Sequence, residues 1–238
     1  MRIAYDGQTR TFGVKDFVKK HKKKILIGGA VAAAAIAGKA AYNEITHPSH
    51  KQNVKAHKDA LLNHEASLRK KFGLSSREFD MLARLSMATT EQETKFGDSL
   101  RYKVKRMVPD VVMETCRWLA GRHDGLSRGY GQVKYDIRDD KTKSIMQGYG
   151  VTPKNVEDSA SKSAILTFGA MAEIYKRDIT GKSYYDKDGN RVDDATALRY
   201  FYNGRGGVLK RGEATPSENL YVNNTNRYLK KQELQWDV

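Results

Sequence analysis

The chain of 238 residues is poor in cysteine, proline and tryptophan, with one, four and two of each. The single cysteine, Cys116, excludes an intrachain disulfide, a cysteine-rich zinc site and an iron–sulfur cluster, because each of these needs several cysteine sulfurs. A single cysteine is compatible with an oxidising and with a reducing compartment. A Walker loop, a dinucleotide fingerprint and a nucleophile elbow are also missing, so nothing indicates a nucleotide-dependent enzyme or a serine hydrolase.

Acidic residues are scarce beside basic ones. The 28 Asp and Glu are outnumbered by 43 Lys and Arg, which gives a formal net charge of +15 at pH 7. This balance excludes a neutral or acidic housekeeping enzyme and indicates a polyanionic partner: nucleic acid, anionic lipid or the phosphate-rich polymers of a cell envelope. With 39% hydrophobic and 30% charged residues, the chain can form one moderate domain with appendages.

The first 42 residues divide into a basic segment and an apolar one. Residues 1–24 hold eight Lys and Arg against two Asp, and residues 25–38 carry no charge. Extended to Tyr42 across Lys39, the apolar run spans ~27 Å as a helix, against a hydrocarbon core of ~30 Å. Lysines just before such a run hold the amino terminus inside. We therefore predict a basic segment at 1–24 and a transmembrane anchor at 25–42, with the body beyond the membrane.

Two other interpretations of residues 25–42 stay open. A secretory signal peptide also begins with a basic region and an apolar run, and Ala35-Ile36-Ala37 offers small residues for cleavage. Its basic region would be unusually long. A buried Ala- and Gly-rich helix is the third interpretation, although a globular helix seldom lacks a polar face over so many residues.

Periodicity and capping patterns predict a mainly helical body. Residues 43–73 indicate a polar linker and an amphipathic helix that ends at Gly73, and Ser75 with Glu78 forms a capping box for a helix to about Phe96. Asp188-Gly189 is typical of a β-hairpin turn. Further helices are expected over 109–120, from Pro153 to about Lys176, and as a last short helix over 195–202 that Asp194 caps.

Glu93 is the first candidate for chemistry. It falls in the last turn of its predicted helix, where the negative end of the macrodipole disfavours a carboxylate, so we expect its pKa to rise. A glutamate that keeps its proton near neutral pH suits general acid catalysis. Taken alone, an ordinary surface glutamate at a helix end would explain the same position. Glu91 points elsewhere on the helix and serves as a comparison that should tolerate change to Gln.

Two later segments support Glu93. The run SRGYGQVK begins at Ser127, about thirty residues after the ETKFG segment, and YFYNG occupies 200–204. In this order the three segments resemble the lytic transglycosylase family of soluble type. Its lysozyme-like domain carries Glu-Ser-x-Phe/Gly, then a serine and a Gly-x-x-Gln loop, then Ala-x-x-x-Tyr-Asn-x-Gly. The resemblance covers roughly residues 78–230.

The resemblance implies a lysozyme-like domain over 74–238 with Glu93 as catalytic acid/base, closed by a helix that contains Tyr221 and Tyr228. The implied reaction cleaves the bond between N-acetylmuramic acid and N-acetylglucosamine in peptidoglycan. One carboxyl group suffices, since the 6-hydroxyl of the sugar closes a 1,6-anhydro ring; no metal or cofactor is implied. The implied substrate-binding residues are Thr94, Ser127, Gly129, Gln132, Tyr202 and Asn203.

The chain departs from the family pattern. Thr94 replaces the usual Ser, Gly131 replaces a bulky apolar residue, the spacing from Ser127 to the loop is tight, and about twenty residues around the KDGN turn look inserted. Most glycosidases use two carboxylates. Lysozyme-type hydrolysis therefore stays open, and the acidic residues near enough in sequence to assist are Asp98, Asp124 and Asp136.

Two weaker patterns are set aside. The histidines at 47, 50, 57 and 64 lack the carboxylate or cysteine that would complete a zinc site, so we interpret them as solvated. Asp186, Asp188 and Asn190 imitate a calcium loop, but Arg191 stands where such a loop needs Gly. A plain hairpin turn explains that segment.

The expected protein is a membrane-anchored, lysozyme-like enzyme acting on peptidoglycan on the cell-wall side of the membrane. It would belong to a bacterial envelope or, preferably, to a phage virion, because wall-binding repeats and a lipidation cysteine are missing. The alternative is a non-enzymatic basic virion protein that binds nucleic acid or membrane. The dispersed charge and the lack of a recognisable nucleic-acid-binding motif disfavour nucleic acid.

Overall fold

The computed structural model describes residues 50–108, 110, 112–113 and 126–231. The basic segment 1–24, the anchor 25–42 and most of the helix expected over 109–120 lie outside the described residues. Among the described residues, no helix has the length and hydropathy needed to cross a bilayer.

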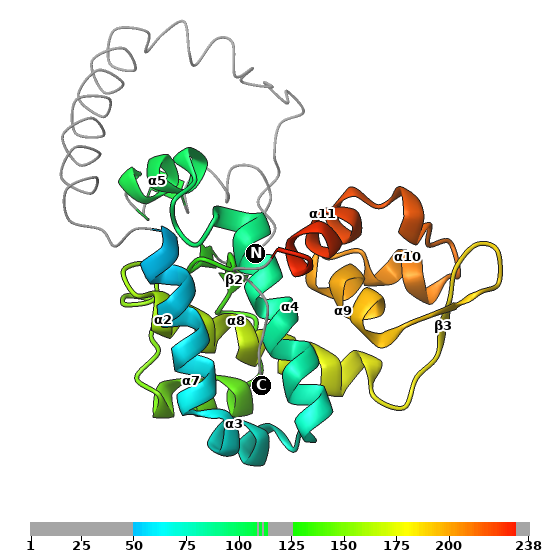
Figure 1. Ribbon diagram of the computed structural model, residues 1–238, viewed down its shortest axis with the longest axis horizontal. Helices are drawn as coiled ribbons and strands as arrows, with labels where there is room; N and C mark the ends of the chain where they lie inside the picture. The colour runs from blue at the N-terminus through cyan, green and yellow to red at the C-terminus, as the bar shows by residue number, and fades with distance from the viewer. Residues whose placement is uncertain (1–49, 109, 111, 114–125, 232–238) are drawn as a thin grey trace, which may run out of the picture. The chain divides into compact units, whose positions relative to one another are not determined.

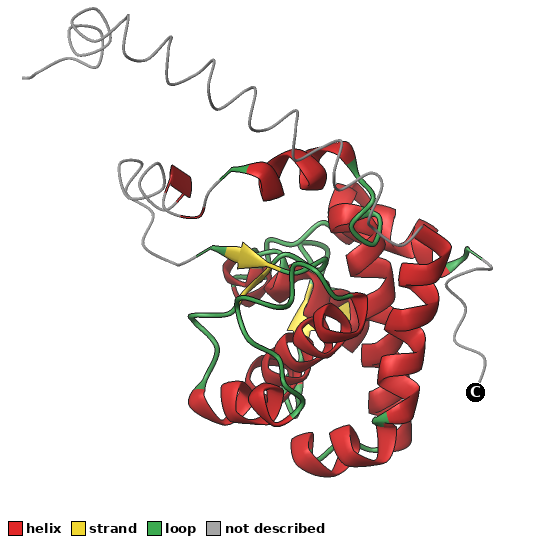
Figure 2. Cartoon of the chain, turned by 90° about the vertical axis from the view of Figure 1, so that its left-hand side faces the viewer, coloured by secondary structure: helices red, strands yellow, loops and turns green. Residues whose placement is uncertain are grey.

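Helices dominate the described chain, and its strands are short (Figure 2). The mainly helical fold class is therefore confirmed. The helices are α2 (His50–Asn63), α3 (Glu65–Phe72), α4 (Ser76–Thr94), α5 (Leu100–Met107), α7 (Asp140–Gly148), α8 (Ala160–Ile174) with a π-helical turn (Tyr175–Ile179), α9 (Asp194–Tyr202), α10 (Gly206–Lys210), a 3-10 turn (Pro216–Glu218) and α11 (Leu220–Leu229).

Two antiparallel hairpins complete the described fold. Strands β1 (Ser127–Arg128) and β2 (Val133–Lys134) pair Ser127 with Lys134, and β3 (Tyr184–Tyr185) and β4 (Arg191–Val192) pair Tyr184 with Val192. The second hairpin and its turn at Asp188-Gly189 are as predicted, with Gly189 at a φ of 77°.

Helix α8 forms the centre of the core. Its residues from Ser163 to Ile174 are all buried, because the segment is largely apolar and packs against α2, α4, α7 and α9 (Figure 1). Phe168 at its middle lies 6.2 Å from the ring of Phe72 and 5.1 Å from that of Phe79. Elements from both halves of the described chain thus meet on one helix.

Helix α4 begins as predicted and ends earlier. The Glu78 amide donates to the Ser75 hydroxyl, and the Ser75 amide donates to the Glu78 carboxylate, which completes the capping box. At the other end Lys95, Phe96 and Gly97 take positive φ values of 52°, 52° and 86°. This left-handed exit ends the helix at Thr94 and turns the Phe96 ring into the core, where it is fully buried.

Several predicted boundaries are wrong. The helix expected from Pro153 begins at Ala160, capped by Ser159, because residues 153–158 form turns and bends. Asp193, not Asp194, caps α9, and α10 and α11 follow it, so α9 is not the last helix. The amphipathic helix before Gly73 is interrupted at His64. Helices α5 and α7 and the β1–β2 hairpin lie in segments too short or too weakly periodic to predict.

The prediction that His57 is solvated is wrong. It lies at the contact of α2 with α4, fully buried, with its Nε2 3.1 Å from the Ser86 hydroxyl and its ring 5.3 Å from that of Phe96. Burial lowers the pKa of His57 from 6.5 to about 3, since the site disfavours the charged imidazolium.

We therefore expect the fold to lose stability in mild acid. The unfolded chain binds a proton at this histidine below pH 6.5, whereas the folded chain resists protonation until about pH 3. The contribution of neutral His57 to the free energy of unfolding is complete above pH 6.5 and is lost as the pH falls. Between pH 6.5 and 5 the free energy of unfolding should fall by up to about 1.4 kcal/mol per pH unit. His57→Met should flatten that slope in urea titrations; equal slopes for the two proteins would contradict this account.

Candidate active site

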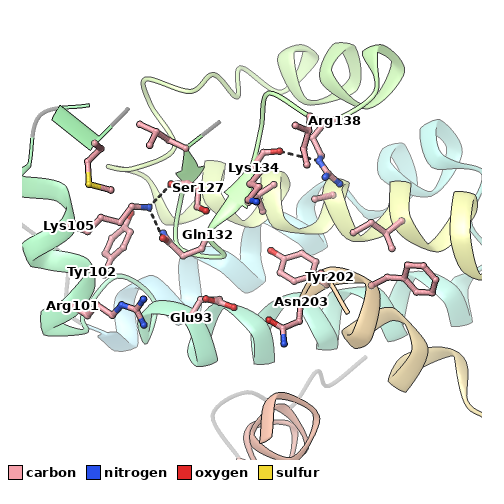
Figure 3. A pocket seen from close by; sticks show the side chains of 18 of the residues that line it. Glu93, Arg101, Tyr102, Lys105, Ser127, Gln132, Lys134, Arg138, Tyr202 and Asn203 are labelled. Carbon is pink, nitrogen blue, oxygen red and sulfur yellow. Dashed lines mark hydrogen bonds between the residues drawn. The ribbon is translucent and has the colours of Figure 1, made fainter. Parts of the chain in front are cut away.

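A cavity of about 810 Å³ lies where the end of α4, helix α5, the β1–β2 hairpin and the ends of α8 and α9 meet (Figure 3). Five of the seven predicted site residues line it, although they come from segments far apart in the sequence: Glu93, Ser127, Gln132, Tyr202 and Asn203. Thr94 and Gly129 do not.

Glu93 extends from the last turn of α4 into the cavity, with Arg101 beside it (Figure 3). Partial burial raises the pKa of its carboxyl group. The Tyr221 hydroxyl, Arg101 and Lys105 act in the opposite direction, because a nearby hydroxyl and two nearby cations each favour the charged carboxylate. Burial prevails, so the carboxyl holds its proton to a higher pH than an exposed glutamate.

The loop between β1 and β2, residues 129–132, presents Gln132 to the cavity, and we call it the glutamine loop. Gly129 takes a φ of +65°, and Gln132 itself has a φ of 54°, which is unusual for a residue with a side chain. The Gln132 amide nitrogen donates to the Gly129 carbonyl at 2.8 Å, and its amide oxygen accepts from the Lys105 ammonium at 2.6 Å. Lys105 also donates to the Ser127 carbonyl at 2.5 Å, so α5 and the hairpin hold the amide in one orientation.

Thr94 holds this loop through hydrogen bonds of its side chain. Its hydroxyl is buried, donates to the Tyr130 carbonyl at 2.8 Å and accepts from the Gly97 amide at 3.0 Å. Gly129 packs against α8, where an added Cβ would lie 2.8 Å from the Ser163 hydroxyl oxygen. Both residues position the loop, and neither lines the cavity, so their contact with substrate stays a prediction.

Tyr202 and Asn203 enter from the end of α9. The Tyr202 hydroxyl donates to the Gly131 carbonyl at 2.8 Å, which joins α9 to the glutamine loop. Burial, reinforced by the negative charge of Glu93, raises the pKa of Tyr202, so its hydroxyl stays protonated. Asn203 ends the helix and lies near Glu93 (Figure 3). Both are predicted to bind substrate, and both lie in the cavity wall.

Tyr221 is a site residue that sequence analysis missed. It lies in the first turn of α11, is 8% exposed, and its hydroxyl comes close enough to Glu93 to lower the pKa of that carboxyl. No hydrogen bond of regular geometry joins the two groups. The sequence places Tyr221 in a closing helix, but only the packing of α11 on α4 brings its hydroxyl to Glu93.

Glu91 is not the neutral comparison expected from the sequence. It is buried and accepts hydrogen bonds from His50 Nε2 and the Lys231 ammonium, each at 2.8 Å. Burial alone would raise its pKa, but these two partners hold the pKa of Glu91 below its ordinary value. Changing Glu91 to Gln would weaken a buried ion pair that joins α2, α4 and the chain after α11.

A second carboxylate is not found in the described cavity wall. Asp98 is half-exposed and pairs with Lys103 at 2.9 Å, Asp136 is exposed, and neither lines the cavity; Asp124 lies outside the described residues. The described residues also contain no group of three or more His, Cys, Asp or Glu side chains placed to hold a metal ion.

No protein-family model, curated protein or solved structure matches this chain. The residues that the fold brings into the cavity therefore carry the functional assignment.

The fit of the glutamine loop against α8 can be tested at Gly131. An added Cβ would lie 2.1 Å from the Thr167 hydroxyl oxygen and 2.7 Å from its methyl group, so the wall leaves no room for the bulkier residue of the family pattern. Gly131→Ala should lower the free energy of unfolding by about 1–3 kcal/mol. Adding Thr167→Ala should relieve the clash, so that the double variant in chemical denaturation is more stable than the sum of the single changes. Strict additivity would show that the loop adapts freely.

Proposed function

We propose that this chain is a peptidoglycan-degrading lytic transglycosylase with Glu93 as its single acid/base. One observation carries the proposal: a partly buried glutamate of raised pKa shares a cavity with Ser127, Gln132, Tyr202 and Asn203. These residues come from three segments that lie far apart in the sequence. A lysozyme-like fold for residues 74–238 belongs to the same proposal.

Cleavage begins with the proton on Glu93. The carboxyl group gives it to the glycosidic oxygen between N-acetylmuramic acid and N-acetylglucosamine, and the bond to the anomeric carbon breaks. Positive charge that develops at this carbon is stabilised by the acetamido oxygen of the same sugar. The N-acetylglucosamine side leaves as an alcohol with the proton from Glu93.

Glu93 then acts as a base. Arg101 and Lys105 stabilise the carboxylate that remains after proton transfer, as their effect on its pKa indicates. The carboxylate accepts the proton of the 6-hydroxyl group while the 6-oxygen bonds to the anomeric carbon. This closes the 1,6-anhydro ring, returns the proton to Glu93 and consumes no water.

The other cavity residues bind and orient the sugars. Gln132 is held with one amide hydrogen committed to Gly129, which leaves its second amide hydrogen for a sugar oxygen. The ring of Tyr202 forms the wall, and Asn203 offers an amide near the scissile bond. Holding the sugar in this geometry accounts for part of the rate enhancement.

The proposal includes the anchor expected at residues 25–42, which would place the enzyme on the cell-wall side of a membrane. A phage virion protein that opens the wall and a bacterial enzyme that remodels it both fit this arrangement. The preference for a phage rests on the sequence alone.

Glu93→Gln should reduce muropeptide release from purified sacculi by about 10²-fold or more, because it removes the general acid and leaves a side chain of the same shape. Its thermal unfolding should stay close to that of the unchanged protein. Asp98→Asn and Asp136→Asn remove carboxylates outside the cavity and should retain activity.

Mass spectrometry of the released sugars identifies the reaction. Anhydro ends are expected; reducing ends would indicate lysozyme-type hydrolysis instead. Retained activity in the Glu93→Gln variant would refute the assignment of the acid. Untouched sacculi together with salt-dependent retention on duplex DNA would favour the non-enzymatic nucleic-acid-binding alternative.

The pH dependence should report the same carboxyl group. Because Glu93 must be protonated to start the reaction, kcat/KM should fall as the pH rises through its pKa, which lies above 4.5. Tyr221→Phe removes a hydroxyl that favours the charged form, so the pKa of Glu93 should rise and the basic limb should move to higher pH. A limb that stays in place, or moves to lower pH, would contradict the role of Tyr221.

A further inference from the structure

Another cavity lies at the opposite end of α4 from Glu93. It has a volume of about 690 Å³ and lies where the start of α4, the π-helical turn after α8, strand β4 and the start of α9 meet. The described residues that line it are all different from those that line the cavity around Glu93. Strand β4 belongs to the hairpin around the KDGN turn, which looks inserted relative to the family pattern. The resemblance therefore does not account for this cavity.

Two arginines in the wall of this cavity have no partner within the described part of the chain. Arg77 lies in the first turn of α4, Arg191 lies in β4, and both are exposed. Neither guanidinium forms an ion pair, a hydrogen bond or a ring contact with a described residue. A guanidinium is planar and matches the two oxygens of a carboxylate. Two elements far apart in the sequence thus bring unpaired positive charge to one cavity.

Three carboxylates also line the cavity, and two of them already have strong partners. Glu78 accepts hydrogen bonds from the Lys176 ammonium at 3.0 Å and from the Ser75 amide at 2.6 Å. Asp193 accepts from the amide of Thr196 at 2.9 Å and from its hydroxyl at 2.8 Å. Both carboxylates therefore cap the helices that begin beside them.

Asp194 is the third carboxylate, and most of its hydrogen-bonding capacity is unused. The one hydrogen bond that its side chain makes within the described chain comes from the Tyr175 hydroxyl at a long 3.5 Å. Burial and the charges of Glu78 and Asp194 raise the pKa of Tyr175 to about 12, so this hydroxyl keeps its proton. An ionised carboxylate can accept about four hydrogen bonds. Asp194 can therefore accept an ammonium group from a ligand.

The unpaired charges at this cavity have opposite signs and do not neutralise each other. Arg77 and Arg191 form no ion pair with Asp194, although all three line the same space. A purely anionic ligand would be repelled by Asp194, and a purely cationic one by the arginines. A ligand with both charges complements both sides. The volume is in the range of small-molecule sites, and Met81 and Ala195 add apolar wall.

We propose that this cavity binds a short peptide or amino acid through its free ammonium and carboxylate groups. Arg77 and Arg191 hold the carboxylate, and Asp194 holds the ammonium. The inference does not rest on the proposed function, because no residue of the cavity around Glu93 takes part.

The test compares free with blocked ligands on the full chain. Alanine, dialanine and tetraalanine are titrated by ligand-observed NMR, each also with its amine acetylated, its carboxyl amidated, or both. For the ligand that binds most tightly, blocking one charge should weaken binding about threefold and blocking both about tenfold, since each exposed ion pair contributes about threefold. At about 1 M salt, where the screening length is ~3 Å, the differences should disappear. Comparison of alanine with the peptides distinguishes a site for amino acids from one for peptides.

Substitutions then assign each charge of the ligand to its partner. In the Arg77→Gln and Arg191→Gln proteins, amidation should weaken binding less than in the unchanged protein, while the effect of acetylation stays the same. Asp194→Asn should show the reverse. Arg205→Gln is the matched control, because Arg205 is also exposed but lines neither cavity. Circular dichroism shows whether each variant is folded, and the two exposed arginines decide the outcome if Asp194→Asn does not fold.

Equal affinity for free and doubly blocked ligands would overturn the inference. Equal effects of Arg77→Gln and Arg205→Gln would do the same, as would a lack of binding by all three ligands in the millimolar range. If amidation weakens binding but acetylation does not, the site takes carboxylates alone and the assignment of Asp194 fails.

Discussion

The candidate site depends on how helix α4 ends. Glu93 occupies its last turn, and the next residue, Thr94, binds the Tyr130 carbonyl and the Gly97 amide with a single hydroxyl. The left-handed exit through Lys95, Phe96 and Gly97 buries the Phe96 ring, and the chain continues into α5, which forms part of the cavity wall. The carboxyl group and the glutamine loop therefore face each other because one buried threonine joins them.

The core helix α8 determines the other side of that loop. Ser163 accepts a hydrogen bond from the Tyr130 amide at 2.5 Å and packs on Gly129, and Thr167 occupies the space that a side chain at 131 would need. Since α8 is buried among four other helices, the loop rests on a helix that close packing holds in place. A site that must hold a sugar in one geometry benefits from such support.

Two glutamates on α4 have pKa values shifted in opposite directions by their surroundings. Glu91 has the less exposed side chain of the two, but His50 and Lys231 bind it directly, and its pKa falls. Glu93 has cations nearby without an ion pair of that kind, so burial prevails and its pKa rises. The same residue type, two positions apart, thus becomes a structural anion in one case and a candidate proton donor in the other.

The sequence by itself determined the features that depend on local chemistry. The Ser75–Glu78 capping box, the hairpin turn at Asp188-Gly189 and the mainly helical class follow from patterns within a few residues. The order of three short segments also pointed to five of the residues that line the cavity. Tertiary structure alone decided that Thr94 and Gly129 support the loop, that His57 and Glu91 are buried, and that Tyr221 and Arg101 approach Glu93. Burial and electrostatic environment arise from contacts between residues tens of positions apart, so the spacing of residues within one segment cannot predict them.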